Sequence, residues 1–185
     1  MLSMEKINAM KKIKEEFKDL NSNPIANIGA TIGLVDDDNI FEWQCSLMGP
    51  KDTSYAGGLF FLRVIFPENY PNSAPDVNFI TPIYHINVNP RKAKFAGAEK
   101  LGHVCISTLN WWKPEYKMRE VLTNIFALFY MGNPDSPYGL ERAEELKHNK
   151  ALYEKKIKYF TKKYANPLSS GKYNQREHDW NFNYP

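Results

Sequence analysis

Four short apolar segments between residues 30 and 79 most constrain the fold of this 185-residue chain. Turn-forming clusters separate them, among them residues 36–39, 49–52 and 67–71. Short connections can join antiparallel strands, whereas parallel strands need a crossover of roughly a dozen residues or more. The pattern predicts an antiparallel meander of four strands, at residues 30–35, 41–48, 59–66 and 77–79.

Helical periodicity flanks this region on both sides. Residues 4–20 predict an amphipathic helix, because apolar residues recur at steps of three and four; these are Ile7, Met10, Ile13, Phe17 and Leu20. Residues 119–131 are too densely apolar for a surface helix, so we expect a mostly buried one. Residues 140–164 predict one or two further helices, with an apolar stripe of Tyr153, Ile157, Phe160 and Tyr164.

A helix, four strands and then helices is the order of an α+β domain with helices at one face or end of an antiparallel sheet. The length suits one domain with a sizeable core. We expect that domain to cover residues 1–166 and a polar extension to cover residues 167–185. The extension carries Trp180, Phe182 and Tyr184, so it is either a loose tail or a strap that docks elsewhere.

Charge and cysteine content narrow the class of protein. A net charge of +3 is too mild for nucleic-acid binding, which needs a concentrated basic stripe. No apolar stretch is long enough for a signal peptide or a membrane span, so we expect a cytoplasmic or nuclear protein without membrane contact. The two cysteines, Cys45 and Cys105, lack the repeated spacing of a disulfide framework. Free thiols are the favoured interpretation.

Cys105 has the most suggestive chemical setting. The segment 84–87, Tyr-His-Ile-Asn, lies upstream of it, and a Trp-Lys-Pro turn lies downstream at residues 112–114. A thiolate is a strong nucleophile, and a nearby N–H donor such as that of Asn87 can stabilise the oxyanion of an acyl-transfer intermediate. Acyl transfer through a thioester is therefore one hypothesis. A cysteine between Val104 and Ile106 can equally be a buried core residue.

The same cysteine could belong to two other kinds of site. A papain-like site would pair Cys105 with a histidine as general base, but no protease signature surrounds the candidates, which are His85, His103, His148 and His178. A metal site would combine Cys105 with Cys45, His85 and His103. No paired Cys-x-x-Cys or His-x-x-x-His spacing supports it.

Several motifs in register resemble the ubiquitin-conjugating enzyme family. They are Phe-Glu-Trp-Gln at 41–44, Met-Gly-Pro at 48–50, Tyr-Ala-Gly-Gly-Leu-Phe-Phe-Leu at 55–62, Phe-Pro-Glu-Asn-Tyr-Pro at 66–71, Ile-Tyr-His-Ile-Asn at 83–87, Val-Cys-Ile at 104–106, Trp-Lys-Pro at 112–114 and Asn-Pro-Asp-Ser-Pro at 133–137. The resemblance covers residues 4 to about 165. It implies the helix, four-strand and helix fold of that family.

The resemblance also implies residue roles. Cys105 aligns with the cysteine that carries ubiquitin as a thioester before its transfer to a substrate lysine. Asn87 aligns with the asparagine of the family's His-Pro-Asn motif, which either stabilises the oxyanion or holds the active-site loop; His85 of that motif is expected to be structural. No metal or nucleotide is expected in this chain, because the activating enzyme uses the ATP.

Two departures from the family pattern lie beside these residues. Ile86 replaces the motif's proline, which would loosen the backbone before Asn87. Ser136, with Asp135 beside it, occupies the position where the family often has an acidic residue near the incoming lysine. We expect His85, Asp135 and Ser136 to support the active-site loop, and we expect activity to survive both departures.

A basic insertion of about ten residues separates Asn87 from Cys105, and it falls within residues 89–101. Its charged residues are Arg91, Lys92, Lys94 and Lys100 against Glu99, so it would place positive charge beside the site. It is either a solvated loop or one that contacts a partner or gates access.

Partner contacts follow from the same resemblance. Lys11 and Lys12 align with first-helix residues that meet the activating enzyme, although a lysine-rich helix face is usually just solvated. Asn72 and Pro114 lie in the loops that bind ligases, and Asn72 replaces a residue that is often hydrophobic. The expected modifier is ubiquitin. Alternatives are another ubiquitin-like modifier or a non-catalytic scaffold that binds modifiers.

Overall fold

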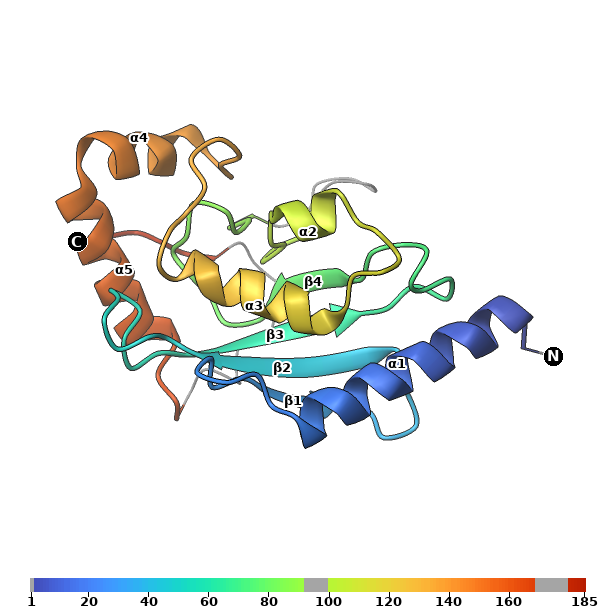
Figure 1. Ribbon diagram of the computed structural model, residues 1–185. Coiled ribbons are helices and arrows are strands. Elements are labelled where there is room, and N and C mark those ends of the chain that lie inside the picture. Colours follow the sequence, from blue (N-terminus) through green and yellow to red (C-terminus); the bar gives the residue numbers. More distant parts are fainter. Residues whose placement is uncertain (1, 92–99, 169–179) are drawn as a thin grey trace.

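The computed structural model describes residues 2–91, 100–168 and 180–185. Helix α1 (Met4–Ser22) precedes strands β1 (Thr31–Leu34), β2 (Glu42–Met48), β3 (Leu59–Ile65) and β4 (Asp76–Phe79), which form an antiparallel sheet in the order β1-β2-β3-β4. Helices α2 (Ser107–Asn110), α3 (Met118–Leu128), α4 (Leu140–His148) and α5 (Lys150–Tyr164) follow (Figure 1). The predicted α+β meander is confirmed. Helix α2 was not predicted, because a single turn is too short to show periodicity.

The sheet buries one face and leaves the other partly exposed. Along β2 and β3 the inward residues are fully buried and pair across the strands in register, as Trp43 with Val64, Cys45 with Leu62 and Leu47 with Phe60. Gln44 and Ile65 on the opposite face are exposed. This alternation is the period-2 pattern of an antiparallel sheet with one packed face.

Helix α1 is turned slightly from the predicted orientation. Ser3 caps its start, because the Ser3 side chain accepts a hydrogen bond from the backbone N–H of Lys6 at 3.1 Å. The buried line of the helix is Ala9, Ile13, Glu16 and Leu20, whereas the predicted residues Ile7, Met10 and Phe17 are only half-buried. Glu16 tolerates burial because its carboxylate accepts bonds from Tyr70 Oη at 2.9 Å and Met118 N at 2.8 Å.

Helix α3 is covered on one side rather than mostly buried. Met118, Val121, Leu122 and Ile125 face the core, while Thr123 and Asn124 are exposed. The predicted helix also ends three residues early, at Leu128, and the side chains that follow the helix at 130 and 131 are exposed. The many apolar residues of this segment therefore belong partly to a buried helix face and partly to an exposed loop that follows the helix.

Residues 140–164 form two helices that divide at Asn149. The Asn149 side chain accepts a bond from Leu152 N at 3.1 Å and so caps the start of α5. The end of α5 is fixed to the sheet, because Leu59 N donates to the carbonyl of Ala165 at 2.8 Å. Among the described helices, none combines the length and the apolar character that crossing a membrane requires.

Candidate active site

Cys105 lies on a loop just before α2, and its thiol is partly accessible. Its backbone N–H donates to the carbonyl of Asn87 at 2.9 Å, which joins the two segments that the sequence placed far apart. The sulfur contacts two polar groups, Ser136 Oγ and Asn110 Nδ2, each at 3.2 Å. An accessible thiol with an adjacent N–H donor has the arrangement that a nucleophilic cysteine requires.

Asn87 is fully buried, and its carboxamide is occupied by the loop after α3. Nδ2 donates to the carbonyls of Asn133 at 2.8 Å and Ser136 at 3.0 Å, and Oδ1 accepts from Asn133 N at 2.6 Å. Both amide hydrogens are therefore used. Of the two roles that the sequence left open, this geometry favours holding the loop over donating to an oxyanion.

His85 is buried and has a partner at each ring nitrogen. Nδ1 accepts from Asn87 N at 2.9 Å, so the proton lies on Nε2, which is 2.9 Å from the carbonyl of Leu128. Burial lowers the pKa of His85 to about 4, with Arg142 adding a smaller effect in the same direction and the hydrogen bond to Leu128 opposing it. His85 is thus a neutral structural residue, and no ring nitrogen is left to act as a base.

Ile86, the residue that replaces the motif proline, is firmly held. Its N–H donates to Tyr153 Oη at 2.9 Å, and its carbonyl accepts from Tyr138 N at 2.7 Å. Gly132 permits the close approach of the loop, because a Cβ there would lie 2.4 Å from Ile86 Cγ2. A backbone N–H that proline would lack therefore anchors this segment and counteracts the loosening expected from the loss of the ring.

The papain-like and metal hypotheses receive no support from the described residues. His103 Nδ1 lies 3.6 Å from Asp76, and His148 Nε2 lies 3.2 Å from Glu144. Cys45 is buried in the sheet, where burial raises the pKa of its thiol to about 12. In the part of the chain that the structure describes, no group of three or more His, Cys, Asp and Glu residues could hold a metal ion. His178 lies outside that part.

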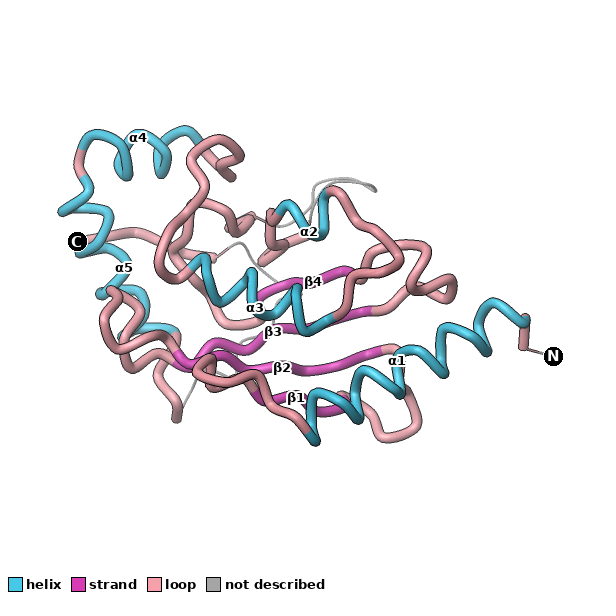
Figure 2. Tube along the Cα trace, viewed as in Figure 1, coloured by secondary structure: helices cyan, strands magenta, loops and turns pink. Residues whose placement is uncertain are grey.

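The loop of residues 133–137 forms one rim of the site. Asp135 and Ser136 are exposed, and Asp135 N donates to Asn133 Oδ1 at 3.0 Å. A groove of about 1230 Å³ begins at this rim and runs between α4, α5 and the loop after β2. Figure 2 shows the long loop segments that lead into α2 and that join α3 to α4.

The insertion between Asn87 and Cys105 is closed at its base. Asn89 N donates to the carbonyl of His103 at 3.0 Å, and Gly102 N donates to that of Asn89 at 2.7 Å. Lys100 pairs with Asp76, so its charge is partly neutralised. Hydrogen bonds from His103, Lys100 and Asn78 outweigh burial and hold the pKa of Asp76 well below its usual range. Lys92, Lys94 and Glu99 lie outside the described residues, and Arg91 is exposed.

The predicted partner residues lie on two surfaces. On α1, Lys11 is exposed, whereas Lys12 is half-buried with its ammonium 3.6 Å from Glu16. Asn72 and Pro114 are both exposed. Their loops are joined, because Trp112 Nε1 donates to the carbonyl of Pro71 at 2.6 Å.

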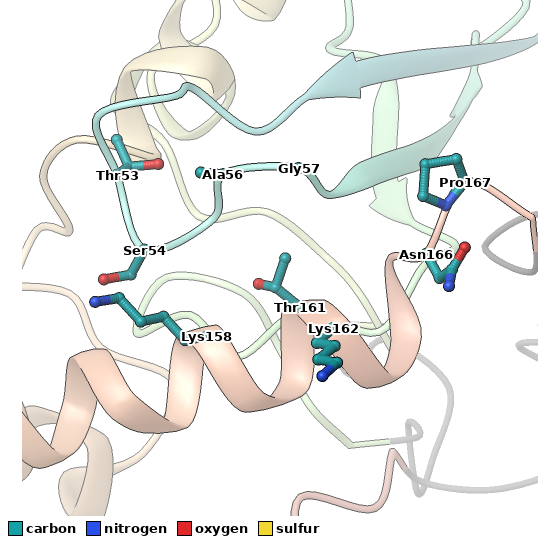
Figure 3. A pocket seen from close by; sticks show the side chains of 9 residues that line it. All are labelled: Thr53, Ser54, Ala56, Gly57, Lys158, Thr161, Lys162, Asn166 and Pro167. Atoms are coloured by element: carbon teal, nitrogen blue, oxygen red, sulfur yellow. The ribbon is translucent and has the colours of Figure 1, made fainter.

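A second hollow, of about 440 Å³, lies between the loop after β2 and α5. Figure 3 shows the Lys158 side chain reaching toward Ser54 across this hollow. It shares no lining residue with the loops around Cys105.

The sequence did not point to Asn110, to Arg142, or to the Tyr153 hydroxyl as the acceptor of the Ile86 N–H. Asn110 is only five residues after Cys105, and an amide so near a candidate nucleophile was the available signal. Arg142, which donates to the carbonyl of His85 at 3.0 Å, gave no such signal, since it lies far along the chain.

The fold and the loops around Cys105 agree with one protein family. The chain matches the family model described as ubiquitin-conjugating enzyme over residues 12–161, which is most of its length. That family comprises transferases that act with ubiquitin, an activating enzyme and ligases. Because the matched span contains the whole sheet, Cys105 and the loops that surround it, the chain belongs to the ubiquitin-conjugating enzyme family.

Proposed function

We propose that Cys105 accepts the C-terminus of ubiquitin from an activating enzyme as a thioester and passes it to a lysine of a protein substrate, usually with a ligase. The observation that carries this proposal is the accessible Cys105 sulfur with Asn110 Nδ2 and Ser136 Oγ at 3.2 Å. The sequence also allowed Cys105 to be a buried core residue without a chemical role. The buried cysteine in this chain is Cys45 instead.

The first step exchanges one thioester for another. The Cys105 thiolate attacks the carbonyl carbon of the thioester on the activating enzyme and forms a tetrahedral oxyanion. The C–S bond to the activating enzyme then breaks, and its sulfur leaves as a thiolate. Bonds of the same type form and break, so this exchange needs no ATP, nucleotide or metal in this chain.

The second step is aminolysis by a substrate lysine. The neutral amine attacks the Cys105 thioester, a proton leaves the nitrogen, and Cys105 departs as a thiolate. Asn110 Nδ2 would stabilise that leaving sulfur through its N–H group. Asp135 is exposed at the rim and suits the position of a carboxylate that orients the ammonium and lowers the cost of its deprotonation.

Asn87 and His85 act in this proposal as supports. Asn87 holds residues 133–136 through its three hydrogen bonds, and His85 accepts the Asn87 N–H. The loop they hold carries Ser136 to the sulfur. The exposed Lys11 is the preferred contact for the activating enzyme, and the joined loops of Asn72 and Pro114 are the preferred contact for ligases.

A charging assay tests the proposal. The protein is mixed with ATP and matched pairs of activating enzyme and modifier, and a thiol-sensitive adduct is sought on a non-reducing gel. We expect an adduct with ubiquitin that Cys105→Ser abolishes or converts to a thiol-resistant ester, and that Cys45→Ala retains. No adduct with any pair would contradict the enzyme proposal, and faster charging by another modifier would contradict ubiquitin as the substrate.

A further inference from the structure

The C-terminal residues 180–185 lie against the end of the molecule that carries α4 and α5 (Figure 1). The Phe182 ring packs edge-on against Phe160, with centroids 4.9 Å apart, and against Tyr84 at 5.4 Å. Tyr164 Oη donates to the carbonyl of Asn181, and Trp180 N donates to that of Pro90 at 3.3 Å. The segment therefore runs from α5 to the chain just beyond Asn87.

Arg142 is buried beneath this segment without a carboxylate partner. Arg142 is only 7% exposed, and no ion pair joins it to a carboxylate in the described part of the chain. The guanidinium instead lies over the faces of two rings that meet at an angle, 4.4 Å from the centroid of Tyr84 and 4.7 Å from that of Phe182, whose own centroids are 5.4 Å apart. An unpaired buried charge is costly, and the two ring faces offset part of that cost.

The held guanidinium acts on the backbone around Asn87. Arg142 Nη1 donates to the carbonyl of His85 at 3.0 Å and, more weakly, to that of Val88 at 3.5 Å. These two carbonyls bracket Ile86 and Asn87. A contact made by Phe182 is thus transmitted through Arg142 to the segment that carries Asn87.

We infer that Phe182 clamps Arg142 onto the segment of residues 85–88, and that Arg142 is a positioning residue for Asn87. Without the Phe182 ring the guanidinium keeps one aromatic face and gains access to water, so its hold on the two carbonyls weakens. The consequence for catalysis rests on the function proposed above. The hold of Phe182 and Arg142 on residues 85–88 is a property of the folded chain and does not depend on that function.

Amide hydrogen exchange of the full-length protein tests the clamp directly. Phe182→Leu keeps an apolar side chain but removes the ring. Tyr184→Leu is the matched control, because Tyr184 packs on Tyr159 at 5.4 Å and on Phe160 at 6.4 Å, whereas the rings over Arg142 are those of Tyr84 and Phe182. We expect residues 84–90 to exchange roughly 3- to 30-fold faster in Phe182→Leu, the range of a cation–π contact. Phe182→Trp should restore the slow exchange. Equal exchange in Phe182→Leu and the unchanged protein, or an equal effect of Tyr184→Leu, would overturn the clamp.

Transfer of ubiquitin from Cys105 to free lysine tests the positioning role at a temperature where all variants are folded. We expect Phe182→Leu to slow transfer several-fold, Phe182→Trp to restore it and Tyr184→Leu to leave it unchanged. Faster exchange at residues 84–90 without slower transfer would show that the clamp only stabilises the fold, which overturns the positioning role. If the unchanged protein is not charged by any modifier, the proposed function fails, and the exchange experiment still decides the clamp.

Discussion

His85 shows how a single side chain can link the stability of the fold to pH. Its pKa of about 4 in the folded protein lies below the ordinary value of 6.5 for the unfolded chain. Between these values the unfolded state binds a proton that the native state does not. Stability from this residue is therefore complete above pH 6.5 and is lost as the pH falls toward 4.

We predict that this one group lowers the free energy of unfolding by about 3 kcal/mol between pH 7 and pH 4. Urea unfolding at a series of pH values measures it. His85→Gln should be less stable at pH 7 and should lose most of the slope between pH 6.5 and 4. His148→Gln, at an exposed residue, should keep the slope, and an unchanged slope in His85→Gln would contradict the assignment.

Asn110 predicts a measurable effect on the reactivity of the thiol. Removing its N–H donor in Asn110→Ala should slow alkylation of Cys105 by iodoacetamide at fixed pH by about two- to tenfold, the range for one hydrogen bond. Asn124→Ala is the matched control, because Asn124 also reaches α2 but contacts Thr108 rather than the sulfur. Equal rates in all three proteins would show that the Asn110 contact does not act on the thiol.

The segment between β4 and α2 depends on a helix far along the chain. Tyr153 of α5 accepts the buried N–H of Ile86 and is itself 5% exposed. Tyr153→Phe removes the acceptor and leaves that N–H unsatisfied, so we predict a loss of about 1–3 kcal/mol in the free energy of unfolding. Tyr159→Phe, at an exposed position of the same helix, should change it little. A small effect in Tyr153→Phe would mean that water replaces the hydroxyl.

The same elements show what sequence patterns could and could not predict. The meander was predictable because a one-sided sheet imposes alternation on neighbouring residues. The burial of Glu16 was not, since its partners Tyr70 and Met118 are 54 and 102 residues away. At the site, motif resemblance predicted Cys105 and Asn87. The roles of Arg142 and of the Tyr153 hydroxyl could not be predicted, because each depends on a contact between remote segments, and such a contact leaves no local sequence pattern.

At the scale of the whole molecule, segments far apart in sequence share one end. Lys6 of α1 forms an ion pair with Glu68 at 2.6 Å, and Trp112 joins the loop of Pro114 to that of Asn72. The Trp112 ring also packs on Tyr70 and Tyr116, at 5.8 and 5.9 Å between centroids. The two loops therefore present their exposed residues as one surface, opposite the end that carries α4 and α5 (Figure 1).

That surface carries polar Asn72 where a ligase pocket built for phenylalanine expects an aromatic ring. We predict that Asn72→Phe lowers the dissociation constant for such a ligase domain by about 10- to 150-fold, since burying a phenylalanine contributes roughly 1.5–3 kcal/mol. Calorimetric titration measures it, and Asn21→Phe, at an exposed residue of α1, controls for nonspecific adhesion. Because the backbone N–H of Asn72 already binds the carbonyl of Asn69 at 2.8 Å, the loop keeps its shape in the variant. If the unchanged protein binds as tightly as Asn72→Phe, residue 72 does not select the ligase.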